Sequence, residues 1–128
     1  MTVRTPEEPA GAVAVPRFIT RIAERVGAAV AADEVLLFGS YAKGRQDVHS
    51  DVDLVVVLNR SPSPALRMAA EDAARGHTLK VDVLVHERSA LLAAAAAQPL
   101  CLLDGALRHG VTVFRRQGVV SVLQGRRA

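Results

Sequence analysis

The sequence contains few of the residues on which disulfide-rich, membrane-spanning or base-stacking proteins depend. Its 128 residues include one cysteine, Cys101, which excludes an internal disulfide framework and a CxxC metal site. No apolar run approaches the roughly 18 residues needed to cross a bilayer, and the first residues do not resemble a signal peptide. The aromatic residues are three Phe, one Tyr and no Trp, too few for the stacking platforms of a nucleic-acid polymerase. We therefore expect a reduced, cytoplasmic, soluble protein with no membrane or nucleic-acid partner.

Size and charge fit one small domain with a basic end. Half of the residues are hydrophobic, and a chain of this length can build a single core. The net charge is +3, but residues 105–128 contain five arginines and no acid, so the first 104 residues are slightly acidic. We expect a flexible leader at 1–15, a domain at 16–117 and a basic tail at 118–128.

Hydrophobic periodicity predicts helices alternating with strands. Helices are expected at 16–31, 65–75, 90–97 and 99–108, and strands at 34–39, 51–58, 79–86 and 111–115. Ser89 is the expected cap of the third helix, and Cys101 is expected in the core. Residues 54–58 are apolar on both faces, as in a central strand covered on both sides. This order predicts an α/β (α+β) fold with one mixed sheet flanked by helices, in a single domain.

Two aspartates stand at the start of this central strand. Asp51 and Asp53 project to the same face because side chains alternate along a strand. Two carboxylates about 5–7 Å apart repel by roughly 2–3 kcal/mol at an effective dielectric constant near 20. Such a pair does not stabilise a fold, but a divalent cation between the carboxylates makes the arrangement favourable. Their hard oxygen ligands suit Mg²⁺, which takes further ligands from substrate phosphates.

Asp82 provides a third carboxylate in the next predicted strand. It is flanked by Val81 and Val83, so its side chain lies on the face opposite theirs. If strands 51–58 and 79–86 are neighbours, Asp82 faces the aspartate pair. The three carboxylates could then hold two metals, or one metal with a base, and activate a hydroxyl nucleophile for attack on phosphorus.

The segment before the aspartates has the features of a phosphate-binding turn. A strand ending in Gly39, followed by Ser40 at the start of a helical turn, presents backbone N–H groups and a hydroxyl to an anion. Gly39 permits close approach of a phosphate, and Lys43 adds positive charge nearby.

The segment GSYAKGRQDVHSDVD resembles the GS-x10-D-x-D signature of the nucleotidyltransferase superfamily that includes DNA polymerase beta. The resemblance covers roughly residues 16–117. It includes the apolar strand before Gly-Ser, the later V-D-V strand and the closing stretch Leu102–Phe114. Its short form is the minimal nucleotidyltransferase domain, from which this chain departs in having Lys43 where arginine is commoner.

The resemblance implies transfer of AMP from ATP, with pyrophosphate as the leaving group. It implies that Gly39 and Ser40 hold the triphosphate, with Lys43 and Ser50 also at the nucleotide. It further implies that Asp51 and Asp53 ligate Mg²⁺ and that Asp82 is a third ligand or a base. These three aspartates are thus the expected catalytic and metal-binding residues.

Minimal domains of this kind often act as antitoxins that adenylylate a tyrosine of a helical HEPN toxin, so the resemblance implies a HEPN-type partner. Two alternatives stay open: a small-molecule transferase of the aminoglycoside type, and an antitoxin that acts by binding alone. The sequence also leaves open whether the chain forms a homo-oligomer.

Overall fold

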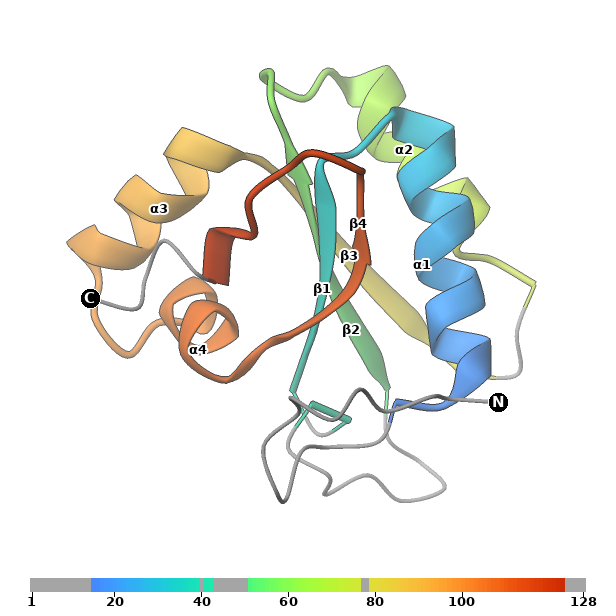
Figure 1. Cartoon of the computed structure of the whole chain (residues 1–128), viewed down its shortest axis with the longest axis horizontal. Helices are drawn as coiled ribbons and strands as arrows, with labels where there is room; N and C mark the ends of the chain where they lie inside the picture. Colours follow the sequence, from blue (N-terminus) through green and yellow to red (C-terminus); the bar gives the residue numbers. More distant parts are fainter. Residues whose placement is uncertain (1–14, 40, 43–50, 77–78, 124–128) are drawn as a thin grey trace.

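A mixed sheet with helices on both faces forms the centre of the computed structural model of this protein (Figure 1). The structure describes residues 15–39, 41–42, 51–76 and 79–123. In chain order the elements are α1 (Arg17–Val30), β1 (Glu34–Phe38), β2 (Val52–Leu58), α2 (Pro64–Ala73), β3 (Val81–Glu87), α3 (Arg88–Ala97), α4 (Leu102–His109) and β4 (Val111–Arg115). The expected fold class and the single domain are therefore confirmed.

The strand order places β2 inside the sheet. Within the described residues the order is β3-β2-β1-β4, with β2 parallel to β3 and β1 antiparallel to both β2 and β4. The parallel pair is connected through α2, as a parallel connection requires a crossover. Residues 54–58 of β2 are buried on both faces, which confirms the prediction of a central strand.

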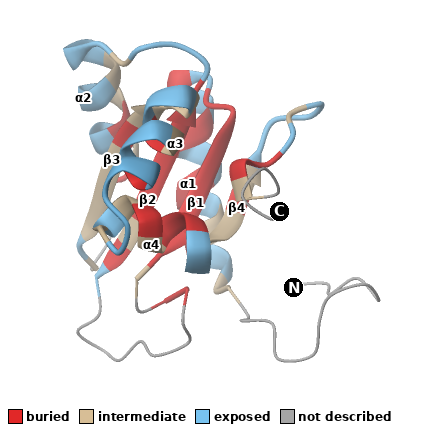
Figure 2. Ribbon diagram, turned by 90° about the vertical axis from the view of Figure 1, so that its left-hand side faces the viewer, coloured by how far each residue is buried: buried red, intermediate tan, exposed pale blue. Residues whose placement is uncertain are grey.

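Two apolar layers hold the helices to the sheet. Ile22 and Val26 of α1 pack with Leu54 of β2 on one face, where α2 also lies. On the other face, Leu91 of α3 and Leu107 of α4 are buried in the second layer. Figure 2 shows the buried sheet behind the largely exposed outer surface of α3. The helices repeat apolar residues along one stripe, and that stripe is the face each of them buries.

Two helix starts differ from the sequence prediction. The N-cap of α3 is Glu87, and Ser89 lies inside the first turn, where its hydroxyl donates to Glu87 Oε1 at 2.7 Å. The last helix begins at Leu102 rather than at residue 99. Its N-cap is Cys101, which is half-buried and accepts a hydrogen bond from the Asp104 N–H at its Sγ (3.4 Å). The prediction that Cys101 belongs to the core is therefore wrong.

The packed domain continues past the expected boundary at residue 117. Ser121 and Val122 are buried, and both bind the fully buried carboxylate of Glu34 at the start of β1. Thr112 of β4 donates to the same carboxylate at 2.6 Å. This buried acid fastens the C-terminal segment to the sheet; residues 1–14 and 124–128 lie outside the described part of the chain.

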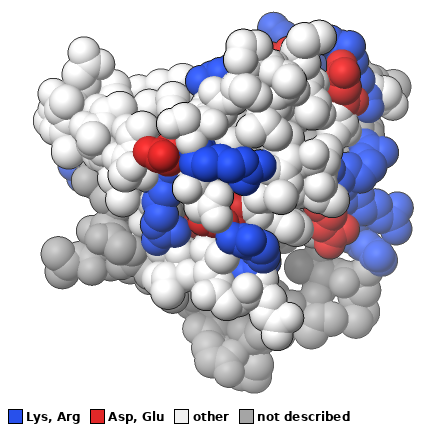
Figure 3. All heavy atoms as spheres, turned by 90° about the horizontal axis from the view of Figure 1, so that it is seen from above, with Lys and Arg blue, Asp and Glu red and all other residues white. Residues whose placement is uncertain are grey.

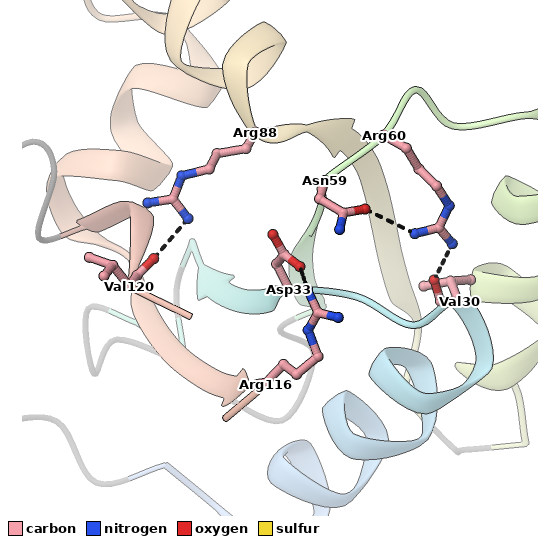
Figure 4. A network of polar contacts seen from close by, with 7 residues as sticks. All are labelled: Val30, Asp33, Asn59, Arg60, Arg88, Arg116 and Val120. Atoms are coloured by element: carbon pink, nitrogen blue, oxygen red, sulfur yellow. Dashed lines mark hydrogen bonds and ion pairs between the residues drawn. The ribbon is translucent and has the colours of Figure 1, made fainter. Parts of the chain in front are cut away.

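Arginine side chains gather on the face of the molecule above the start of β1 (Figure 3). Arg116 pairs with Asp33, Arg60 donates to the Val30 carbonyl oxygen at 2.7 Å, and Arg88 donates to the Val120 carbonyl oxygen at 2.8 Å (Figure 4). These contacts tie loops at this end of the sheet to one another. The positive charge expected near the C-terminus is thus partly used to hold the fold together.

No single helix in the described part of the chain is long and apolar enough to cross a membrane. Only α3 and α4 taken together reach that length and composition, and they meet at a bend of 109°.

Candidate active site

The candidate site lies at the end of the sheet opposite the arginine-rich face, where β1 ends and β2 and β3 begin (Figure 1). The strand register aligns Phe38 of β1 with Asp53 of β2, and Asp53 with Asp82 of β3. Neighbouring strands lie roughly 4.8 Å apart. The two aspartates therefore stand side by side on the face that carries α3 and α4.

Gly39 ends β1 directly beside the Asp53 carboxylate. Its φ of 77° lies in the left-handed region that favours glycine. A Cβ atom at this position would lie only 2.5 Å from Asp53 Oδ2. Glycine is thus required both by the backbone turn and by the close approach of the carboxylate.

The charges of the three predicted aspartates influence one another, as the pKa of Asp53 shows. Burial raises the pKa of Asp53 above its ordinary value, and the charges of Asp82 and then Asp51 raise it further. Lys80 lowers it in part, with its Nζ 3.8 Å from Asp82 Oδ1. Both side chains of this ion pair are well exposed, so solvent screens their interaction. The carboxylates consequently repel one another, and in the described part of the chain no buried positive charge balances them.

A pocket of about 490 Å³ opens beside the aspartates. Asp53, Asp82 and Glu71 supply its acidic lining, and apolar side chains supply most of the rest. The lining residues are Phe38, Gly39, Asp53, Glu71, Val81, Asp82, Val83, Leu84 and Leu102. The volume is in the range of small-molecule sites in proteins. Acidic oxygens and apolar surface thus face the same space.

The carboxylate oxygens of the site suit a magnesium ion whose remaining ligands come from water and a bound substrate. Carboxylate oxygens are its preferred protein ligands, and Mg²⁺ usually takes only one or two of them and completes its shell with water and phosphate oxygens. Among the described residues, no three Asp, Glu, His or Cys side chains form a ready-made metal-binding group. The raised pKa of Asp53 nevertheless marks a place where bound positive charge is favourable. Asp51, Asp53 and Asp82 are therefore the residues that would hold such an ion.

The rest of the predicted phosphate-binding turn lies outside the described residues. Ser40, Lys43 and Ser50 belong to this group, so their roles stay predictions. Tyr41 is described: it is buried and packs edge-on against Phe18, with ring centroids 6.3 Å apart. Tyr41 is therefore a packing residue in this structure.

Sequence reasoning missed several residues around the pocket. Glu71 comes from α2 and Leu102 from the start of α4, and neither belongs to a recognisable motif. Lys80 lies directly before β3 and two residues before Asp82, and this spacing is the signal that could have identified it. Packing of the helices against the sheet edge, which is not readable from local sequence, brings the other two to the site.

A sequence profile of the nucleotidyltransferase domain matches residues 16–94, more than half of the chain. The chain therefore belongs to this family, whose reaction class is nucleotidyl transfer. The predicted family and enzyme class are thus confirmed. The matched region contains Gly39, Asp53 and Asp82, the residues that the structure brings together.

One relative is a protein of Methanocaldococcus jannaschii that carries the provisional name protein adenylyltransferase MJ0141. The two sequences are 38% identical over 53 residues, which are 41% of this chain and 54% of the relative. The match thus spans about half the length of that protein.

Solved structures share the fold. One, described as a toxin–antitoxin with AMP-PNP, has a TM-score of 0.57 at 21% identity and covers 77% of this chain and 74% of its own. A protein from Sulfolobus solfataricus, provisionally assigned as a nucleotidyltransferase, has a TM-score of 0.53 at 19% identity and covers 91% and 98%. A mutant of the toxin–antitoxin MntA-HpeT has a TM-score of 0.52 at 18% identity and covers 79% and 73%.

Proposed function

We propose that this protein transfers AMP from ATP to a hydroxyl group of a partner protein, with a tyrosine of a HEPN-type toxin as the acceptor, and so acts as an antitoxin. The observation that carries the proposal is the alignment of Asp53 with Asp82 beside Gly39, at the mouth of a pocket, in a nucleotidyltransferase domain. The name of the Methanocaldococcus relative and the two toxin–antitoxin neighbours support the protein acceptor.

The proposed reaction breaks a phosphoanhydride bond of ATP and forms a phosphodiester bond to the acceptor. The acceptor oxygen attacks the α-phosphorus of ATP, and the bond from that phosphorus to the bridging oxygen of the β-phosphate breaks. Pyrophosphate leaves, and the acceptor hydroxyl loses its proton to Asp82 or to water. Bound Mg²⁺ supplies neutralising charge for the phosphates and the developing negative charge.

Each described site residue has a place in this scheme. Asp53 and Asp51 would hold the ion, and Asp82 would serve as a further ligand or as the base. Gly39 leaves the end of β1 open toward the carboxylates. Ser40, Lys43 and Ser50 are proposed to bind the triphosphate.

Labelled ATP tests the proposal directly. The purified chain is incubated with Mg²⁺, a HEPN-type protein as the proposed acceptor, and ATP carrying ³²P in either the α- or the γ-phosphate. We expect label on the partner from α-labelled ATP only, because the γ-phosphate leaves with pyrophosphate. The label should require Mg²⁺ and be absent with Asp53→Asn.

Other outcomes identify the alternatives. Label from γ-labelled ATP would indicate phosphoryl transfer and contradict the proposal. Label on an aminoglycoside but not on the protein would favour a small-molecule transferase. If the wild-type chain and Asp53→Asn neutralise the partner equally without labelling it, the protein acts by binding alone.

A further inference from the structure

Two leucine side chains project from the turn between α3 and α4. Leu100 is 90% exposed and Leu102 is 61% exposed, although large apolar side chains are usually buried in a small domain. Leu102 lines the same pocket as Asp53 and Asp82. We call residues 98–102 the leucine turn.

The fold holds this turn in a conformation that keeps Leu100 outside. The φ of Leu100 is 70°, in a region that costs roughly 1–2 kcal/mol for a residue with a side chain. Its N–H donates to Asp104 Oδ2 at 2.8 Å, and Arg108 Nε donates to the same oxygen at 2.8 Å. Asp104 is 1% exposed, so the carboxylate that fixes the turn is itself fixed. A strained backbone and an exposed leucine both oppose stability, which favours a role in binding.

The chemistry of the turn fits a protein surface. Residues 98–102 contain no charged side chain, whereas the phosphates of a nucleotide or a nucleic acid need positive partners. The apolar surface continues from Leu102 into the pocket, where Val83 and Leu84 contribute to the lining and Asp82 lies beside them. Under the proposed function, an aromatic acceptor side chain entering along this surface would bring its hydroxyl toward the carboxylates.

We infer that the leucine turn is the docking surface for the protein that carries the acceptor hydroxyl. Leu102 contacts the acceptor side chain in the pocket, and Leu100 contacts the protein surface around it. This inference rests on the proposed function, since it assigns the acceptor side of the same site. It gives the two leucines separable roles.

Leu100→Asn is the main test variant. Asparagine tolerates a positive φ better than leucine, so this variant should fold at least as well as the wild type while losing the apolar contact. Met68→Asn is the matched control, because Met68 is 62% exposed on α2 and does not line the pocket. We expect Leu100→Asn to raise the KM for the HEPN-type acceptor protein by about 10-fold or more, with kcat and ATP affinity unchanged. Met68→Asn should behave as the wild type.

A small acceptor molecule distinguishes the roles of the two leucines. N-acetyltyrosinamide carries the acceptor hydroxyl but no protein surface around it, so Leu100→Asn should not change its labelling. Leu102→Asn should reduce labelling of both the small acceptor and the protein. Equal behaviour of Leu100→Asn and Met68→Asn with the protein acceptor would overturn the inference while leaving the proposed function intact.

A binding measurement keeps the two hypotheses apart. If the wild type labels neither acceptor, the proposed function fails. Titration calorimetry with the HEPN-type protein still tests docking: loss of binding with Leu100→Asn supports the surface, and unchanged binding overturns it. Sedimentation tests a second copy of this chain as the occupant. Dissociation of a wild-type dimer by Leu100→Asn would assign the turn to self-association and overturn the inference.

Discussion

The two ends of the sheet carry carboxylates in opposite situations. At the start of β1, Glu34 accepts hydrogen bonds from Thr112, Ser121 and the Val122 N–H, and the neighbouring Asp33 pairs with Arg116 (Figure 4). At the other end, Asp53 stands beside Asp82 and Asp51, and burial, followed by the charges of these two aspartates, raises its pKa. At one end, groups of the same chain bind the acidic side chains, whereas at the other end carboxylates of like charge lie beside one another.

This difference separates acids that stabilise the fold from acids available to a ligand. Buried polar groups with full hydrogen bonding contribute to a unique structure. Groups whose pKa is raised by burial and by like charges beside a pocket are typical of functional sites. Substitutions at the start of β1 should therefore change stability, and substitutions at the aspartates should change activity.

Asp53→Asn should give the largest effect. The substitution keeps the shape of the side chain but removes the charge proposed to hold Mg²⁺, so AMP transfer should fall by roughly 100- to 1000-fold. Stability at pH 7 should be equal to or greater than that of the wild type, because one repelling charge is gone. Single-turnover transfer and urea unfolding measure the two quantities.

Asp72→Asn is the control for Asp53→Asn, since Asp72 lies on α2 in an exposed ion pair with Arg75. It should change neither transfer nor stability by a measurable amount. An Asp53→Asn protein that folds and transfers AMP at the wild-type rate would show that the acidic end is not the catalytic end.

Glu34→Ala should lower stability and leave activity unchanged, which is the reverse of the result expected for Asp53→Asn. It leaves the hydrogen-bond donors of Thr112, Ser121 and Val122 without their buried acceptor, which should lower the free energy of unfolding by about 3 kcal/mol. Transfer per folded molecule should be unchanged. Urea unfolding measures the loss; a cost under about 1 kcal/mol would mean that the C-terminal segment is not fastened through this carboxylate.

Gly39→Ala should affect both stability and activity. The added Cβ would meet Asp53 Oδ2, and the alanine would have to adopt an unfavourable φ. Together these should lower the free energy of unfolding by about 2 kcal/mol. Gly118→Ala is a matched control, because Gly118 has a φ of 86° but no atom within 4 Å of the added carbon. Only the excess of Gly39→Ala over Gly118→Ala reports the contact with Asp53. If the two variants lose equal stability and neither loses transfer, that contact has no role.

The sequence predicted the order of elements and the faces of the aspartates well, because alternation along a strand decides which side Asp53 and Asp82 occupy. Their alignment depends on strand order and register, which are tertiary properties. A shift of one residue between β2 and β3 would have placed Asp82 on the opposite face. The contact of Gly39 with Asp53 likewise follows from the pairing of β1 with β2.

The helical side of the site was less predictable. Cys101 was expected in the core because Leu100, Leu102 and Leu103 surround it, but Leu100 and Leu102 face solvent. Local hydrophobicity could not show this, because the orientation of the turn is fixed by Asp104, a buried polar residue. Glu71 and Leu102 line the pocket through helix packing alone.

The pH dependence of stability offers the smallest and most specific test of the comparison between the two ends. The folded-state pKa of Asp53 is raised, chiefly by burial, so the folded state holds this proton more readily than the unfolded chain. Protonation of Asp53 therefore favours the folded state. This contribution to stability is fully present below the pKa of the unfolded chain, near 3.9, and is lost as pH rises through the raised pKa of the folded state. In metal-free buffer, the stability of Asp53→Asn relative to the wild type should therefore increase over this range and then level off. Added Mg²⁺ should reduce the difference by stabilising the wild-type carboxylate, as urea unfolding at a series of pH values would measure. A difference that is constant with pH, or that decreases as pH rises, would mean that Asp53 is as well satisfied in the fold as Glu34.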